Sequence, residues 1–169
     1  PWSDDDLRAA CDDTIGAARI DAANATAGIE RLRITITGGP GPLGSDRSDV
    51  PPTLVIAAGP GSPWPAATSV VTVPWTRNER SAVAGLKTTS YAENAVALAH
   101  ARAAGAAEAL LANTRGELCE GTGSNVFAVL DGVALTPPLR SGCLAGVTRE
   151  LVLEWGGAPT EERDLPYEV

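Results

Sequence analysis

A run of glycine and proline between residues 59 and 65, Gly-Pro-Gly-Ser-Pro-Trp-Pro, most constrains how this chain can fold. Proline fixes φ and has no backbone N–H to donate, so a segment with three prolines in seven residues continues neither a helix nor a central strand. Such a segment is typical of a linker. The sequence therefore predicts two domains, at residues 1–60 and 67–169, joined by a linker at residues 61–66.

Helical and strand patterns alternate along the chain. Ser3 followed by three aspartates predicts a helix start, and apolar residues then recur at helical spacing to Arg19. Further helices are predicted over residues 89–104 and 147–155. Alternating or short apolar runs predict strands at 29–37, 53–58, 69–73, 109–112, 117–120, 125–130, 133–136 and 160–163. Asp131-Gly132 predicts a hairpin turn. Several hairpins among mixed elements indicate the α+β class rather than a doubly wound sheet.

The composition argues against several kinds of partner and site. The 169 residues include 13 Lys plus Arg and 21 Asp plus Glu, a formal net charge of −8, which disfavours nucleic-acid binding through phosphate contacts. No stretch approaches the roughly 18 consecutive apolar residues of a membrane span. The three cysteines are widely spaced and odd in number, so they predict neither a disulfide framework nor a metal site. Buried thiols in a cytoplasmic protein are the expectation.

Lys87 is the only lysine among thirteen basic residues. Arginine stays protonated, whereas lysine can lose its proton and attack a carbonyl. A lysine that persists in so arginine-rich a chain is therefore a candidate nucleophile. The alternative is a surface lysine that was retained by chance.

Two further features could serve such a nucleophile. Glu120 ends a mostly apolar strand, and glycines in the segment that follows would let a ligand approach the backbone. Residues 142–149 end in a helix start, where free N–H groups and the Thr148 hydroxyl could accept a phosphate. An amine, a strand-end carboxylate and a phosphate-accepting helix start are the three anchors that pyridoxal phosphate needs. Each feature alone also fits an ordinary structural residue.

At these residues the chain resembles the class IV, fold-type IV pyridoxal-phosphate enzymes, which include branched-chain and D-amino-acid aminotransferases and 4-amino-4-deoxychorismate lyase. The matching segments, in the order and spacing of the family, are Lys87-Thr-Thr-Ser-Tyr-Ala-Glu-Asn94, Glu108-Ala-Leu-Leu111, Glu120-Gly-Thr-Gly-Ser-Asn-Val-Phe127, Asp131-Gly132, Thr136-Pro-Pro138 and Ser141-Gly-Cys-Leu-Ala-Gly-Val-Thr-Arg149. The resemblance implies that residues 1–60 end the smaller N-terminal α/β domain. Residues 67–169 would form most of the larger cofactor-binding domain, truncated at its C-terminus. We therefore expect a fragment of a longer protein.

The resemblance implies a role for each matched residue. Lys87 would be catalytic, forming a Schiff base with pyridoxal 5′-phosphate and moving a proton between substrate and cofactor. The other implied cofactor contacts are Tyr91 at the ring 3′ oxygen, Glu120 at the pyridine nitrogen, Leu144 on the ring face, and Val147 and Thr148 at the phosphate. Arg149 is expected to be structural, and Ser124 and Asn125 to fix the loop behind the ring. The family's N-terminal phosphate-binding arginine has no counterpart in this chain.

The implied reaction acts on an amino-acid-like small molecule. The short Lys87–Tyr91 segment, without the Gly-Gly-Asn of branched-chain enzymes, favours 4-amino-4-deoxychorismate lyase, which eliminates pyruvate to give 4-aminobenzoate. The alternative is an aminotransferase that uses a D- or branched-chain amino acid with 2-oxoglutarate. A non-catalytic α+β module and a cofactor-free Schiff-base lyase remain open as other classes. The family also implies a homodimer.

Overall fold

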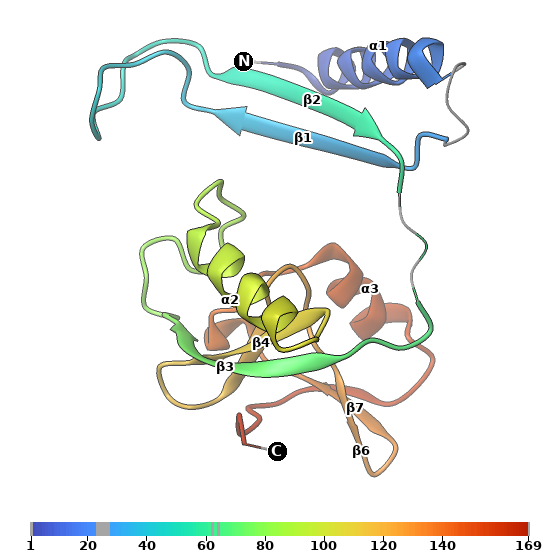
Figure 1. Cartoon of the computed structure of the whole chain (residues 1–169), viewed down its shortest axis with the longest axis vertical. Helices are drawn as coiled ribbons and strands as arrows, with labels where there is room; N and C mark the ends of the chain where they lie inside the picture. The colour runs from blue at the N-terminus through green and yellow to red at the C-terminus, as the bar shows by residue number, and fades with distance from the viewer. Residues whose placement is uncertain (1, 23–27, 62, 64, 169) are drawn as a thin grey trace. The chain divides into compact units, whose positions relative to one another are not determined.

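The computed structural model describes residues 2–22, 28–61, 63 and 65–168, of which residues 20–22 by their backbone alone. The chain forms two compact units, Pro1–Trp64 and Pro65–Val169 (Figure 1). The division falls inside the segment for which a linker is predicted. Residues 62 and 64 of that segment lie outside the described residues.

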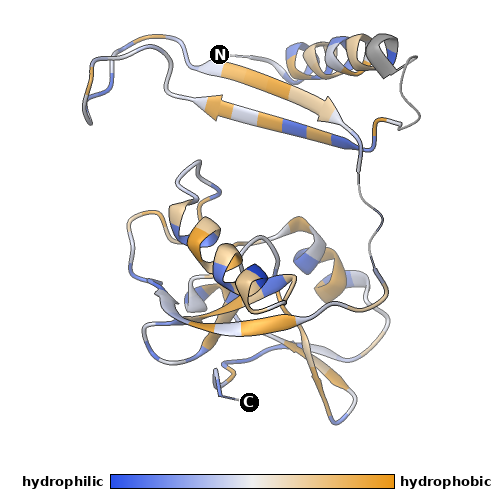
Figure 2. Cartoon of the chain, in the orientation of Figure 1, coloured by the Kyte–Doolittle hydropathy of each residue, from blue (hydrophilic) through white to orange (hydrophobic). Residues whose placement is uncertain are grey.

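The first unit is a helix with a two-stranded antiparallel sheet. It contains α1 (Asp4–Ala22), β1 (Arg31–Thr37) and β2 (Thr53–Gly59). The predicted helix start is confirmed, because the Ser3 hydroxyl accepts the Asp6 N–H at 3.2 Å and the Ser3 N–H donates to the Asp6 carboxylate at 2.9 Å. Apolar and polar residues alternate along β1 (Figure 2), so its apolar side chains share one face with those of β2, as in the pair Ile34 and Ile56.

The second unit holds two three-stranded sheets. The first has the order β3-β4-β5, and β3 runs parallel to β4 because α2 connects them as a crossover. The second has the order β6-β7-β8. The elements are β3 (Val70–Arg77), α2 (Ala92–Ala103), β4 (Glu108–Asn113), β5 (Leu118–Gly121), β6 (Ala128–Leu130), β7 (Val133–Thr136), the 3-10 helix η1 (Leu139–Ser141), α3 (Val147–Trp155) and β8 (Thr160–Glu162). This mixture of parallel and antiparallel pairs agrees with the predicted α+β class.

Two apolar clusters form the core of the second unit. In the first, the small side chains of Ala97 and Ala101 let α2 lie close against β3 and β4, where Val73, Ala109 and Leu111 are buried. The second brings Leu118, Leu135 and Leu165 together, so the C-terminal segment packs on both sheets. The clusters anchor β3 through Val73 and β5 through Leu118.

Several predicted boundaries are wrong, and for three of them the hydrogen bonds of the structure give the reason. The strand predicted to end at Val73 continues to Arg77, because the pairing with β4 tolerates Pro74 at an irregularity between Thr72 and Thr76. The helix predicted from residue 89 begins at Ala92, because Thr88, Thr89 and Ser90 form hydrogen-bonded turns instead. The strand predicted from residue 125 begins at Ala128, since the Asn125 side chain bonds to a neighbouring loop.

The hairpin turn predicted at Asp131-Gly132 is confirmed. Both residues adopt positive φ, 51° and 81°, the backbone conformation of the tight turn that joins β6 to β7. Among the residues described, no helix has the length and apolar character to cross a bilayer. Within the same part of the chain, no three His, Cys, Asp or Glu side chains gather as metal ligands.

Candidate active site

Lys87 lies in the segment between β3 and α2, four residues before Tyr91, the N-cap residue of α2. Its Nζ donates a 3.2 Å hydrogen bond to the Tyr91 hydroxyl and lies 5.8 Å from the centre of the Tyr91 ring. Backbone hydrogen bonds from Leu86 to Val83 and from Thr88 to Leu86 fix the turns around the lysine. Both side chains are exposed, so a small molecule can reach the amine.

Glu120, near the end of β5, is a largely buried acid whose side chain is 12% exposed. Its carboxylate accepts the Leu144 N–H at 2.9 Å, and its Oε1 lies 3.2 Å from Nε of Arg77. Burial raises the pKa of Glu120, while the Leu144 N–H, Arg77 and Lys87 oppose that rise. A carboxylate has about four acceptor positions, so these contacts leave room for one more donor, such as a ring N–H.

Leu144 is held from both sides. Its N–H is donated to Glu120, and its carbonyl accepts a 2.8 Å hydrogen bond from the Asn125 side-chain amide. Gly146 packs so tightly against Asn125 that a Cβ there would collide with the side-chain oxygen. The loop after β5 therefore fixes the turn that leads into α3.

The N-terminus of α3 is suited to an anion. Gly146 is its N-cap residue and has no side chain that could satisfy the free N–H groups of the first turn. Val147 and Thr148, the first two residues of the helix, are exposed. The helix dipole and the Thr148 hydroxyl add to the attraction for a phosphate.

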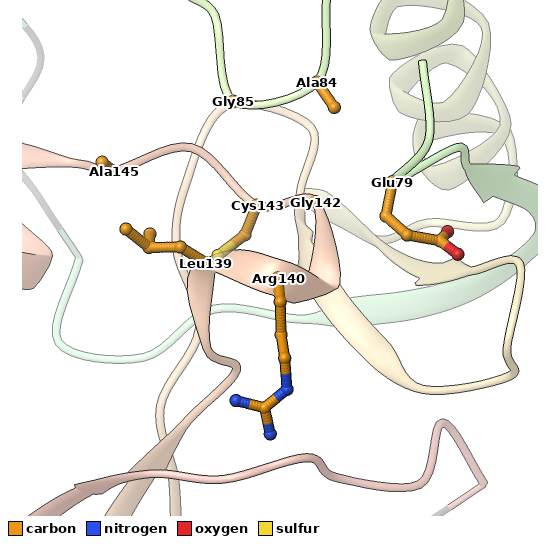
Figure 3. Close-up of a pocket in the computed structure, with 8 residues that line it drawn as sticks. All are labelled: Glu79, Ala84, Gly85, Leu139, Arg140, Gly142, Cys143 and Ala145. Carbon is orange, nitrogen blue, oxygen red and sulfur yellow. The ribbon is translucent and has the colours of Figure 1, made fainter. Parts of the chain in front are cut away.

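A hollow of about 230 Å³ lies beside the turn that precedes α3 (Figure 3). Ala84 and Gly85, just before the lysine, line it on one side, and Gly142, Cys143 and Ala145 line it on the other. Gly142 has a φ of 94° and would clash with the backbone of Glu79 if it carried a Cβ. The loop that carries Lys87 and the turn that precedes α3 are thus close neighbours.

The six residues predicted from the sequence divide into two groups. Four of them form two hydrogen-bonded pairs, Lys87 with Tyr91 and Leu144 with Glu120. Val147 and Thr148 belong to the adjoining helix start, and no direct contact joins either residue to the other four among the hydrogen bonds of the described residues.

The surrounding loop residues behave as the sequence predicts. Ser124 donates to Glu108 at 3.1 Å and Asn125 donates to Leu144, so both fix the loop after β5. Arg149 is 5% exposed and bonds to the Pro137 carbonyl and to Glu162, which makes it structural.

Sequence reasoning missed the charged residues at the end of β3. Arg77 contacts Glu120, and Glu79 accepts hydrogen bonds from the Thr114 backbone and hydroxyl. The signal that could have found them is the polar run Arg77-Asn78-Glu79-Arg80, which directly follows an apolar strand. It was obscured because the strand was predicted to end before Pro74.

Comparisons with known proteins point to one family. The sequence model described as amino-transferase class IV matches residues 1–169. A Methanocaldococcus jannaschii protein named "Putative branched-chain-amino-acid aminotransferase" is 34% identical over 127 residues, 73% of this chain and 44% of its own. A branched-chain amino acid aminotransferase structure from Thermobaculum terrenum, in its pyridoxal-phosphate form, is 30% identical with a TM-score of 0.67, covering 89% of this chain and 52% of its own.

A third match extends over nearly the whole fold. The Legionella pneumophila structure described as "Putative 4-amino-4-deoxychorismate lyase" has a TM-score of 0.85 over 98% of this chain and 61% of its own. At 23% identity it shows the shared fold only. The chain spans about half the length of these relatives. The chain therefore belongs to the amino-transferase class IV family, with the fold-type IV architecture.

Proposed function

We propose that this chain is part of a pyridoxal-phosphate-dependent enzyme that acts on amino-acid-like substrates. The observation that carries the proposal is the placement of the only lysine, hydrogen-bonded to Tyr91 on a loop that shares a hollow with the turn before α3, from which Leu144 donates to Glu120. Membership of the class IV family and the pyridoxal-phosphate form of the Thermobaculum relative support it. On the same resemblance, residues 1–60 would end a small domain and residues 67–169 would belong to the larger one.

The residues present fit this cofactor. Bound pyridoxal phosphate supplies an aldehyde that an amine can attack and a ring that accepts electrons from a substrate carbon. Lys87 Nζ is an accessible amine that can hold or deliver a proton at that carbon. Glu120 keeps free acceptor capacity for a ring N–H, and the Val147 N–H and the Thr148 hydroxyl can bind a phosphate. Leu144 would border the ring, since its N–H anchors the same carboxylate.

Two reactions remain compatible with such a site. The name of the Methanocaldococcus relative supports transfer of an amino group from a branched-chain amino acid. The short segment from Lys87 to Tyr91 supports the lyase reaction, elimination of pyruvate from aminodeoxychorismate. We favour amino-group transfer, because sequence relatives above 30% identity carry that name, whereas the lyase structure shares the fold at 23% identity. The homodimer and the cytoplasmic location stay predictions.

Cofactor attachment is the first experiment. Full-length protein mixed with pyridoxal phosphate should gain a visible absorption band, and borohydride should fix the label on the peptide that contains Lys87. Because residues 1–169 contain a single lysine, a label that mass spectrometry finds on any peptide of this region is a label on Lys87. Lys87→Arg should lose the label. In Arg102→Lys, which adds an amine on α2, the label should stay on Lys87 and none should appear at position 102. A wild-type protein that stays unlabelled contradicts the proposal.

The reaction is tested separately with the full-length protein. Branched-chain or D-amino acids with 2-oxoglutarate should yield glutamate and the matching keto acid, and aminodeoxychorismate should yield no 4-aminobenzoate. Formation of 4-aminobenzoate without keto-acid turnover would replace amino-group transfer by the lyase reaction.

A further inference from the structure

Arg77 is the cation in direct contact with Glu120. It is the last residue of β3, its side chain is 18% exposed, and its Nε lies 3.2 Å from Oε1 of Glu120. The two residues are 43 positions apart in the sequence. They lie on the two outer strands of one sheet, β3 and β5, and their side chains meet across the intervening strand β4. Two largely buried side chains of opposite charge thus face each other behind the candidate site.

The guanidinium is held in place by groups other than Glu120. One of its nitrogens donates to the side-chain oxygen of Asn94 at 3.1 Å, and another pairs with Glu93 at 3.3 Å. Both partners belong to the first turn of α2. Asn94 also donates to the carbonyl of Thr122, in the loop that directly follows Glu120. The first turn of α2 therefore holds the guanidinium that faces Glu120.

The charge of Arg77 is permanent, and that of Lys87 is not. Lys87 must lose its proton to act as a nucleophile, and its charge then no longer offsets that of Glu120. Arginine stays protonated at any physiological pH. A buried carboxylate without a partner is costly, so it either takes up a proton or turns away. Arg77 supplies the partner at every stage of a reaction at Lys87.

We propose that Arg77 is a positioning residue for Glu120. Its guanidinium keeps the Glu120 carboxylate charged and directed at the candidate ring site while Lys87 changes its protonation state. The proposal rests on the proposed pyridoxal-phosphate function for its purpose, but the pairing itself can be measured without cofactor. A purely structural role, in which Arg77 only fastens α2 to β3, would make different predictions.

The first test uses full-length protein without cofactor. The carboxyl carbon of Glu120, assigned with Glu120→Gln, is titrated by NMR in the wild type, Arg77→Met, Arg77→Lys and Glu93→Gln. We expect Glu120 to titrate at higher pH in Arg77→Met. Glu93→Gln should titrate like the wild type, because Asn94 still holds the guanidinium, glutamine keeps an oxygen that can accept from Arg77, and the 70% exposed Glu93 does not touch Glu120. A folded Arg77→Met protein with an unchanged Glu120 titration overturns the proposal.

The second test measures pyridoxal-phosphate affinity by fluorescence and by the pH profile of the visible band. Arg77→Met should weaken binding at least about tenfold, equivalent to about 1.4 kcal/mol. In the Glu120→Gln background the same substitution should have little further effect, because Arg77 acts through Glu120. Additive losses would show a structural role instead and overturn the proposal.

Arg77→Lys keeps the test decisive if Arg77→Met fails to fold. Lysine retains the charge but lacks the planar fork that reaches Glu93 and Asn94. We expect Arg77→Lys to bind the cofactor more weakly and to shift the pH profile of the band. Wild-type values for both quantities would overturn the proposal. If wild-type protein binds no cofactor, the proposed function fails, while the NMR titration still decides whether Arg77 governs Glu120.

Discussion

The side-chain amide of Asn125 donates a 2.8 Å hydrogen bond to the carbonyl of Leu144, whose own N–H is donated to Glu120. One residue of the turn before α3 is thereby fixed by two segments that border β5. The positions of the carboxylate and of the helix start are consequently linked. Loss of the Asn125–Leu144 hydrogen bond should therefore affect the Glu120 carboxylate as well as the N-terminus of α3.

Asn125→Ala should lower the free energy of unfolding by about 0.5–1.5 kcal/mol, because the half-buried Leu144 carbonyl loses its side-chain partner and keeps only the Gly146 N–H. Urea unfolding gives the stability, and pyridoxal-phosphate titration should show weaker binding. Ser124→Ala is the matched control, since its exposed hydroxyl bonds only to Glu108 and the loss should stay within about 0.5 kcal/mol. Equal stabilities of the two variants would contradict this prediction.

Tyr167 supplies a hydrogen-bond partner where the pairing of β3 with β4 is irregular. Its hydroxyl accepts the Val73 N–H at 2.7 Å and lies 2.6 Å from the Leu110 carbonyl, to which it can donate. Tyr167→Phe should destabilise the protein by about 1–3 kcal/mol, because buried backbone groups lose a partner beside Pro74. Tyr91→Phe is the control by urea unfolding, since the exposed Tyr91 hydroxyl should contribute little to stability. The prediction fails if both phenylalanine variants unfold at the same urea concentration.

Glu79 should make folding sensitive to acid. Hydrogen bonds from the hydroxyl and the N–H of Thr114 lower its pKa from 4.5 to about 2, with a smaller contribution from Arg115. Because the folded-state pKa is depressed, this stabilisation is present above pH 4.5 and is lost as the pH falls through about 2. Glu79→Gln should therefore lower Tm near neutral pH, and its difference from the wild type should shrink in that acidic range.

Thermal unfolding across this pH range measures the effect of Glu79. Glu154→Gln, at an exposed position on α3, is the matched control and should follow the wild type at every pH. A constant Tm difference between Glu79→Gln and the wild type down to the acidic end would show that ionisation of Glu79 is not the cause.

The three thiols should differ in reactivity. Cys119 and Cys143 are 1% and 2% exposed, and burial raises the pKa of both, that of Cys119 to about 12. Near pH 8 the Cys119 thiol therefore holds on the order of a thousandth of the thiolate of an ordinary cysteine. Cys11, partly exposed on α1, should react first with a thiol reagent. Cys11→Ser should abolish the fast phase, and a fast phase that persists in this variant would contradict the burial of the other two.

Local sequence patterns predicted most elements, because capping, periodicity and turn chemistry act between residues a few positions apart. The Ser3–Asp6 cap and the Asp131-Gly132 turn are examples. The patterns failed where distant segments decide the outcome. Pro74 ends an isolated strand, yet β3 passes through it because β4 and Tyr167 supply partners on either side.

The sequence by itself determined the chemical types at the candidate site: one lysine, a strand-end glutamate and a glycine-capped helix start. Only the tertiary structure decided how these groups are paired and charged. Arg77 reaches Glu120 across the intervening strand, and Asn125 reaches the turn before α3 through its side chain. Such contacts depend on strand order and register, which are fixed when buried side chains of distant segments pack together, and no spacing along the chain records them.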